Sequence, residues 1–241
     1  MRLITIGTSH GVPEAHRRCS SSLLEINGSY YVVDMGTQTV EDLRHRGIAI
    51  RDVRMVICTH PHGDHTDGLI SFVDLVNWYF KDASPTVILP NEKLIEAMKL
   101  WLTTVESGNP VREGIRFEVT QPGVTYKDEN VTVRAIPTQH CKDSFALLFE
   151  AEGKKILFTG DLRHPTVDFP AAAFEEDIDL ILCELAHFSP DDCVPVFDKT
   201  KAKRILHNHI SPRWHGELAA QLKQPHPYEY GAVYDGMEFV I

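Results

Sequence analysis

Several features that would decide a protein's class are missing from this sequence. It has only five cysteines in 241 residues, an odd number without a C-x-x-C pair, which argues against a disulfide framework and a thiolate zinc site. No apolar run approaches the roughly 18 residues that a membrane span needs, and the amino-terminal segment does not resemble a signal peptide. These absences predict a soluble protein in the reducing cytoplasm.

Basic residues are also few. The chain has 24 Lys and Arg against 34 Asp and Glu, a formal net charge of −10. Proteins that hold nucleic acid by broad phosphate neutralisation usually carry a basic surface, so nucleic acid is not the favoured partner. The chain also has no internal repeat, low-complexity tract or linker. Its length suits a single domain over residues 1–241.

Histidine is plentiful, with 13 residues, and it is concentrated in one segment. His60, His62, Asp64 and His65 form the pattern H-P-H-G-D-H directly after the apolar run 55–58. This context predicts a loop at the carboxyl end of a strand. Imidazole nitrogen and carboxylate oxygen are ligands that divalent metals prefer when thiolates are absent. A metal site is favoured over a histidine-rich turn, because this spacing rarely arises by chance.

Hydrophobic periodicity and turn residues predict many short strands with interspersed helices. We expect strands at 3–6, 22–26, 30–34, 53–58, 87–89, 115–120, 124–127, 131–138, 145–150, 155–158, 178–185 and 204–206. We expect helices at 37–46, 66–80, 91–105, 194–201 and 217–223, and a final hairpin at 231–241. Asn91 is a predicted N-cap, and residues 107–110 should end the third helix. This order favours two mixed sheets packed face to face with helices outside.

Further candidate ligands follow other predicted strands. His140 comes after the strand at 131–138, and Asp161 comes after T-G, where Gly160 permits close backbone approach. His207 and His209 follow R-I-L. The strand period does not decide between these two histidines, because it directs both to one face. Ligand-type side chains at the ends of strands are typical of sites on mixed sheets.

The ordered pattern H-P-H-G-D-H, a histidine after a strand, T-G-D and a strand-end histidine resembles the metallo-β-lactamase superfamily. The segments I-G-T-S-H-G-V-P, C-S-S-S-L-L-E-I, Y-V-V-D-M-G and H-I-S-P-R-W are similar to the branch that contains ribonuclease Z and cyclic phosphodiesterases. The resemblance covers nearly the whole chain. It implies an α/β (α+β) fold, the αββα four-layer sandwich of two mixed sheets flanked by helices.

The resemblance also implies a site with two divalent metal ions, zinc first and manganese or iron as alternatives. One metal would be held by His60, His62 and His140, the second by Asp64, His65 and His209, and Asp161 would bridge them. His209 is chosen because it starts the matching H-I-S-P-R-W segment, which leaves His207 for the surrounding layer. Asp34 matches an aspartate that supports the metal loop.

The implied chemistry is hydrolysis by a hydroxide that two metals share. Asp64 is expected to orient this nucleophile as a catalytic residue, and His187, in C-E-L-A-H-F-S-P, to protonate the leaving group. The alternative for His187 is a histidine that closes a buried strand. His10 and His164 are expected to line the pocket.

The expected function is therefore a phosphodiesterase acting on a small or cyclic nucleotide-like phosphodiester. One alternative is a ribonuclease Z-like endonuclease that processes transfer RNA 3′ ends, although the chain lacks a basic Gly/Pro-rich arm between Asp161 and His187. Others are a hydrolase of carbon esters, thioesters or lactones, and a metal-binding sensor without turnover. The broad apolar face of the helix 67–80 leaves a homodimer open.

Overall fold

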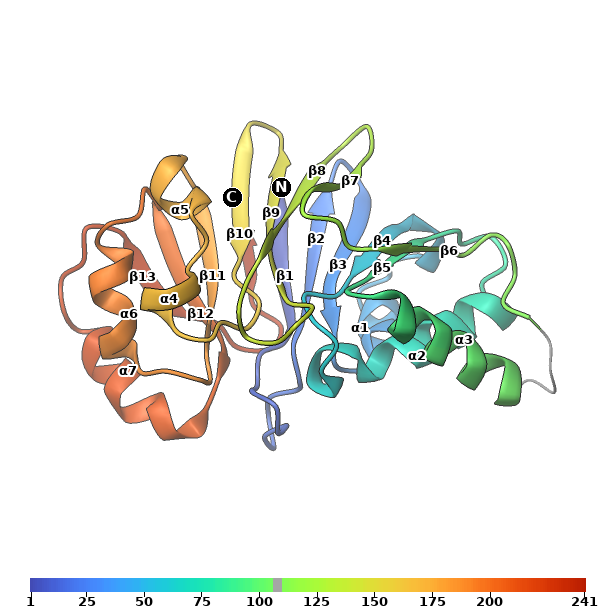
Figure 1. The fold of residues 1–241 in the computed structure, drawn as a ribbon, viewed down its shortest axis with the longest axis horizontal. Helices are drawn as coiled ribbons and strands as arrows, with labels where there is room; N and C mark the ends of the chain where they lie inside the picture. Colours follow the sequence, from blue (N-terminus) through green and yellow to red (C-terminus); the bar gives the residue numbers. More distant parts are fainter. Residues whose placement is uncertain (106–109) are drawn as a thin grey trace.

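Two seven-stranded sheets lie face to face in the computed structural model, which describes residues 1–105 and 110–241 (Figure 1). The first sheet has the order β14-β1-β2-β3-β4-β5-β6, and the second has the order β13-β12-β11-β10-β9-β8-β7. The strands of the first sheet are β1 (Arg2–Gly7), β2 (Ser21–Ile26), β3 (Ser29–Met35), β4 (Val53–Ile57), β5 (Thr86–Leu89), β6 (Arg116–Val119) and β14 (Glu238–Val240). Those of the second are β7 (Gly123–Lys127), β8 (Thr132–Pro137), β9 (Phe145–Ala151), β10 (Lys154–Phe158), β11 (Leu180–Leu185), β12 (Arg204–Ile210) and β13 (Glu229–Ala232).

Both sheets are mixed in the same way. In the first sheet β1, β2, β3 and β14 pair antiparallel, and β3 to β6 pair parallel. In the second sheet β7 to β10 pair antiparallel, and β10 to β13 pair parallel. Parallel neighbours end at the same edge of a sheet, so the loops that follow β10, β11 and β12 leave side by side.

A shared hydrophobic core fills the space between the sheets. Tyr31 and Val33 of β3 and Leu180 and Leu182 of β11 face this core, whereas the alternate residues of both strands face the outer helices. Because both faces of these strands are covered, their sequences read as nearly continuous apolar runs. Residues of both sheets therefore contribute to one hydrophobic cluster.

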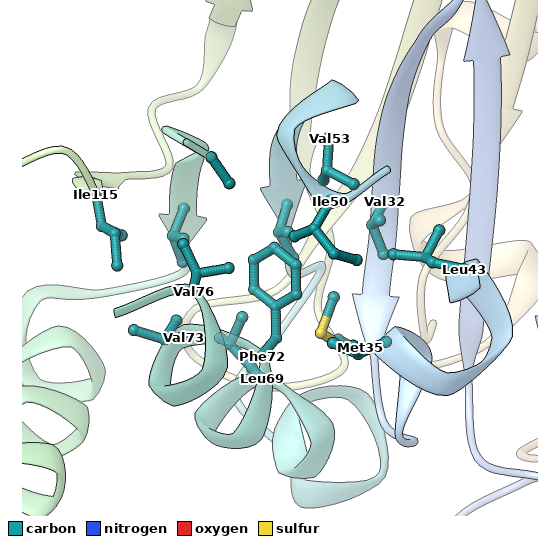
Figure 2. Close-up of a cluster of buried hydrophobic side chains, with 14 of the residues drawn as sticks. Val32, Met35, Leu43, Ile50, Val53, Leu69, Phe72, Val73, Val76 and Ile115 are labelled. Atoms are coloured by element: carbon teal, nitrogen blue, oxygen red, sulfur yellow. The ribbon is translucent and has the colours of Figure 1, made fainter. Parts of the chain in front are cut away.

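Helices cover the outer face of each sheet. The first sheet carries α1 (Thr39–His45), α2 (Gly63–Trp78) and α3 (Glu92–Val105), and Figure 2 shows Phe72 of α2 beside Met35 in the core beneath these helices. The second sheet carries α4 (Pro165–Asp168), α5 (Ala172–Glu175), α6 (Pro190–Phe197) and α7 (His215–Gln221). Two 3-10 turns, η1 (Ile50–Asp52) and η2 (Pro212–Trp214), complete the elements. The predicted sandwich of two mixed sheets flanked by helices is thus confirmed.

Three predicted helix starts are wrong. Helix α1 begins at Thr39 with Gln38, not Thr37, at the N-cap, and α2 begins at Gly63 rather than at Thr66 or Asp67. Helix α6 spans 190–197, not 194–201, because Ser189 and Asp192 form a reciprocal capping box ahead of Pro190. The Asn91 prediction is confirmed, since its side-chain oxygen accepts a hydrogen bond from Leu94 N at 2.9 Å. The predicted helix break at 107–110 lies mostly outside the described residues.

The last two strands do not form the predicted hairpin. β13 pairs with β12 in the second sheet, and β14 crosses to pair with β1 in the first. The turn at Asp235–Gly236 is therefore a crossing between sheets, held by Thr8 Oγ1 donating to Asp235 Oδ1 at 2.7 Å. Within the described residues, no helix is both long and apolar enough to cross a membrane.

Candidate metal centre

All seven predicted metal ligands lie together where strand ends from both sheets meet. They come from the loop and first helical turn after β4 (His60, His62, Asp64, His65), from the segments after β8 (His140) and β10 (Asp161), and from β12 (His209). The ligand atoms of His60, His62 and His140 form one group within 4.8 Å, and those of Asp64, His65 and His209 form another. These are the two groups that the resemblance implied.

The ligand atoms of the first group lie close together around one point. His62 Nδ1 lies 3.1 Å from His60 Nε2 and 3.2 Å from His140 Nε2. Asp161 Oδ2 lies 3.6 Å from both His60 Nε2 and His140 Nε2. Four ligand atoms from three separate segments therefore face one another across short gaps.

The second group shares the Asp161 carboxylate with the first. Asp64 Oδ2 lies 3.5 Å from His65 Nε2 and 3.6 Å from His209 Nε2. Asp161 Oδ1 lies 3.4 Å from His65 Nε2, and Asp161 Oδ2 lies 3.4 Å from His209 Nε2. The Asp161 carboxylate thus lies within 3.6 Å of ligand atoms in both groups.

Two observations show that this donor set fits divalent metal ions. A tetrahedral ion with Zn–N bonds of about 2.0–2.1 Å separates its ligand atoms by about 3.3–3.4 Å, which is close to the gaps measured here. In addition, His65 Nε2 and Asp161 Oδ1 are buried and have no hydrogen-bond partner among the described residues. Buried polar atoms without partners are costly, and a cation between them would remove that cost.

Other side chains orient the imidazole rings. Asp34 Oδ2 lies 2.8 Å from His65 Nδ1, and Asp34 Oδ1 accepts a hydrogen bond from Thr59 N at 2.7 Å. Ser20 Oγ lies 2.8 Å from His209 Nδ1. A hydrogen bond at Nδ1 leaves Nε2 as the nitrogen that can bind a metal. Asp34 therefore occupies the supporting place expected for it, whereas nothing in the sequence had pointed to Ser20.

Burial and neighbouring charges shift the pKa values of His60 and His65 in opposite directions. Burial and the neighbouring His65 lower the pKa of His60 to about 2, so that ring is neutral at pH 7. Burial opposes charge on His65 too, but the Asp34 and Asp161 carboxylates outweigh it and raise the pKa of His65 to about 10. Although Asp161 is buried, which would raise its pKa, His209 and His65 hold that pKa well below its usual range. The low pKa keeps the shared Asp161 carboxylate ionised and therefore able to bind a cation.

The structure separates His207 from His209. The predicted strand 204–206 continues to Ile210, and a bulge interrupts its pairing with β11, so that Glu184 pairs with Asn208 and Leu185 with Ile210. His209 is the extra residue, with φ of 50°, and its ring turns to the metal centre. His207 is fully buried, with its Nε2 at 2.7 Å from Tyr230 Oη.

Gly160 has the close approach that the sequence predicted. Its φ is +57°, and a Cβ there would lie 2.8 Å from Phe145 O and 3.0 Å from Thr59 Cβ. A side chain at this position would displace the loop that delivers Asp161. The glycine therefore sets the position of the shared carboxylate.

His187 stands beside the first group and is held by a buried carboxylate. Its Nδ1 lies 2.9 Å from both carboxylate oxygens of Glu184 and 3.8 Å from Asp161 Oδ2. Glu184 also accepts hydrogen bonds from the backbone N–H groups of Leu162 and Ala186, at 2.8 and 2.9 Å. The hydrogen bond with Glu184 raises the pKa of His187. Glu184 was missed in the sequence, although a lone acid within L-I-L-C-E-L was a usable signal.

A cavity of about 460 Å³ opens above the centre. It is lined by His10, Gly11, His62, Asp64, His140, Asp161, Ala186, His187, His209, Ser211 and Arg213. His10 lines it as expected, but His164 does not. The His164 ring instead accepts a hydrogen bond from Thr166 N at the start of α4 and lies 3.8 Å from Asp192.

Comparison with known proteins agrees with this geometry. The family model described as anti-Pycsar protein Apyc1 matches residues 1–193. The chain belongs to that family. A ribonuclease Z from Pseudomonas putida (strain W619) is 30% identical over 151 residues, which are 62% of this chain and 46% of that protein. The chain thus spans about half the length of the first curated relatives it matches. A ribonuclease Z from Geobacillus kaustophilus is 24% identical over 92% of both chains.

Solved structures share the fold over the whole chain. The metallo-β-lactamase fold protein YhfI from Bacillus subtilis has a TM-score of 0.80 at 17% identity, covering 99% of this chain and 98% of its own. Human tRNase Z, short form, has a TM-score of 0.77 at 19% identity, covering 100% and 99%. A diphosphatase from the PhnP family has a TM-score of 0.74 at 18% identity, covering 100% and 97%. The predicted metallo-β-lactamase fold is confirmed, and the predicted similarity to ribonuclease Z is confirmed by the curated relatives.

Proposed function

We propose that this protein is a metal-dependent hydrolase that cleaves small phosphodiesters of the cyclic nucleotide kind. The observation that carries the proposal is the opening of both ligand groups into one cavity of about 460 Å³. This volume is in the range of small-molecule sites. Relatives named ribonuclease Z and a structural neighbour named a diphosphatase support chemistry on phosphate esters.

The proposed resident cofactors are two divalent metal ions. His60, His62 and His140 would hold one, Asp64, His65 and His209 the other, and Asp161 both. When bound, such a pair lowers the pKa of water and neutralises charge on a phosphoryl group. A donor set of imidazoles and carboxylates suits zinc and also admits manganese or iron.

Two protein groups would handle protons in the reaction. The Asp64 carboxylate lines the cavity and would accept a hydrogen bond from the attacking water. His187 has Nδ1 bound to Glu184, which leaves Nε2 free to donate a proton to the departing alkoxide. Arg213 also lines the cavity, and its guanidinium, which donates to Ala186 O, would pair with a phosphate oxygen.

Processing of transfer RNA is the second candidate, favoured because the curated relatives are named ribonuclease Z. Two features of this chain weigh against it. Between Asp161 and His187 the chain forms two four-residue helices, α4 and α5, and the sheet strand β11, which leaves no arm that could grip a folded RNA. The net charge of −10 also disfavours binding that depends on phosphate neutralisation.

One set of assays tests these functions together. Protein stripped of metal and reloaded with zinc or manganese would be given a cyclic mononucleotide, bis(p-nitrophenyl) phosphate, a thioester and a precursor transfer RNA. We expect metal-dependent turnover of the first two. Cleavage of the RNA with no turnover of the cyclic nucleotide would favour the nuclease, and turnover of the thioester alone would favour carbon-ester chemistry. Tight metal loading without turnover of any substrate would indicate a sensor and overturn the proposal.

A further inference from the structure

One of the histidines that line the cavity has no hydrogen-bond partner for its ring among the described residues. Five histidines line the cavity: His10, His62, His140, His187 and His209. Four of them are engaged, because His62 and His140 contact each other, His209 contacts Ser20, and His187 contacts Glu184. The ring of His10 makes no hydrogen bond to any of the residues in 1–105 and 110–241. It is thus available to a ligand.

The backbone around His10 is held firmly on both sides. Ser9 N donates to Arg18 O at 2.8 Å, Ser9 Oγ donates to Val12 O at 2.8 Å, and Ser9 bridges to Ile210 of β12. The buried Arg17 donates through Nε to Thr8 Oγ1 at 3.0 Å. This loop between β1 and β2 projects from the molecule in Figure 1. Its base is nevertheless tied to the second sheet, so His10 has a fixed place in the cavity wall.

His10 lies in the part of the cavity wall that continues β1, beside the end of β12. Residues 186–187 and 211–213 continue β11 and β12 of the second sheet, whereas His10 and Gly11 continue β1 of the first. Gly11 brings this wall next to the ligands, since a Cβ on it would lie 3.4 Å from Asp64 Oδ2. A substituent of a phosphoryl group bound at the centre would share this cavity with His10.

The cavity otherwise offers little to a flat organic group. Its lining contains no Phe, Tyr or Trp, and the other polar side chains are used by the metal groups or suited to phosphate. Burial and the nearby His209 lower the pKa of His10, which favours the neutral ring. A neutral imidazole presents a flat face and a hydrogen-bonding edge, and aromatic faces hold nucleobases by stacking.

We propose that His10 is a specificity-determining residue that stacks on the base of a nucleoside substituent of the phosphodiester. This inference rests on the proposed phosphodiesterase function. It identifies the nucleobase as the part of the substrate that the loop between β1 and β2 contacts. Alanine at position 10 would then weaken selection of nucleoside esters over simple alkyl esters.

Two esters with the same p-nitrophenolate leaving group test this role. They are thymidine 5′-(p-nitrophenyl phosphate) and methyl p-nitrophenyl phosphate. The ratio of their kcat/KM values therefore measures the contribution of the nucleoside. In the metal-loaded His10→Ala variant we expect this ratio to fall about 5- to 50-fold. His10→Phe should keep most of it, because the flat ring remains. An equal loss in both variants would overturn stacking, and an unchanged ratio in His10→Ala would overturn the role altogether.

His16→Ala is the matched control, because His16 is an exposed histidine of the same loop. It should keep the wild-type ratio. Calorimetric binding of thymidine 5′-monophosphate to the metal-loaded protein gives a readout that needs no turnover. His10→Ala should raise its Kd by the same factor, and an unchanged Kd would count against His10. If the wild-type protein hydrolyses neither ester, the phosphodiesterase proposal fails, while the Kd comparison still decides the role of His10.

Discussion

The two halves of the candidate metal centre are encoded in different ways. One half is local, since the segment 60–65 supplies four candidate ligands from one loop and the first turn of α2. The other half is dispersed, because His140 and Asp161 follow β8 and β10 and His209 lies in β12 of the second sheet. The local half depends on one short stretch of backbone. The dispersed half exists only when the second sheet has folded and packed against the first.

The largest expected effect comes from removing Asp161, the dispersed residue that both ligand groups share. Asp161→Ala should abolish tight binding of both metal ions and lower phosphodiesterase activity by more than about 10³-fold, because both groups share this carboxylate. Metal content after dialysis and the rate with bis(p-nitrophenyl) phosphate measure the two losses. Asp67→Asn is the matched control, since Asp67 is an exposed aspartate two residues beyond the local segment. Retention of both ions in Asp161→Ala would show that the two ligand groups bind metal without the shared carboxylate.

The local half was readable from the sequence because its spacing alone is informative. The motif predicted His60, His62, Asp64 and His65 as neighbours in space, and they are. Its secondary structure was predicted less well, because Gly63 begins the helix before the apolar periodicity becomes visible. Periodicity detects the buried face of a helix and is silent about a first turn that faces a metal site.

The dispersed half needed information that single residues do not carry. His140 and Asp161 were located as residues at strand ends, and only the order of the motifs connected them. Strand periodicity could not separate His207 from His209, because a bulge in β12 breaks the two-residue period at His209. The crossing of the chain between β13 and β14 was missed for a related reason, since turn residues do not reveal which sheet a strand joins.

Substitutions of the two histidines of β12 test which of them binds metal in the dispersed half. His209→Ala should lose about one metal ion per protein and more than about 100-fold in activity, since even the partners of metal ligands contribute up to that factor. His207→Phe should keep both ions. It should lower the Tm by a few degrees, because Tyr230 loses its partner at a cost of about 1–3 kcal/mol. Metal analysis and thermal unfolding distinguish the variants, and loss of an ion from His207→Phe would reverse the assignment.

The smallest expected effect concerns Glu184, which acts on the dispersed half without touching a metal ligand directly. The Glu184 carboxylate raises the pKa of His187, and a general acid is active only while protonated, so kcat/KM should fall as pH rises through that pKa. In Glu184→Gln the charge is lost, the pKa of His187 drops, and this alkaline limb should move to lower pH. Near pH 8 we expect about a tenfold loss with a cyclic nucleotide, whose alkoxide needs a proton. The loss with bis(p-nitrophenyl) phosphate should be smaller, because p-nitrophenolate departs unaided. Equal losses on both substrates, with an unmoved limb, would mean that Glu184 only supports the loop through its bonds to Leu162 and Ala186.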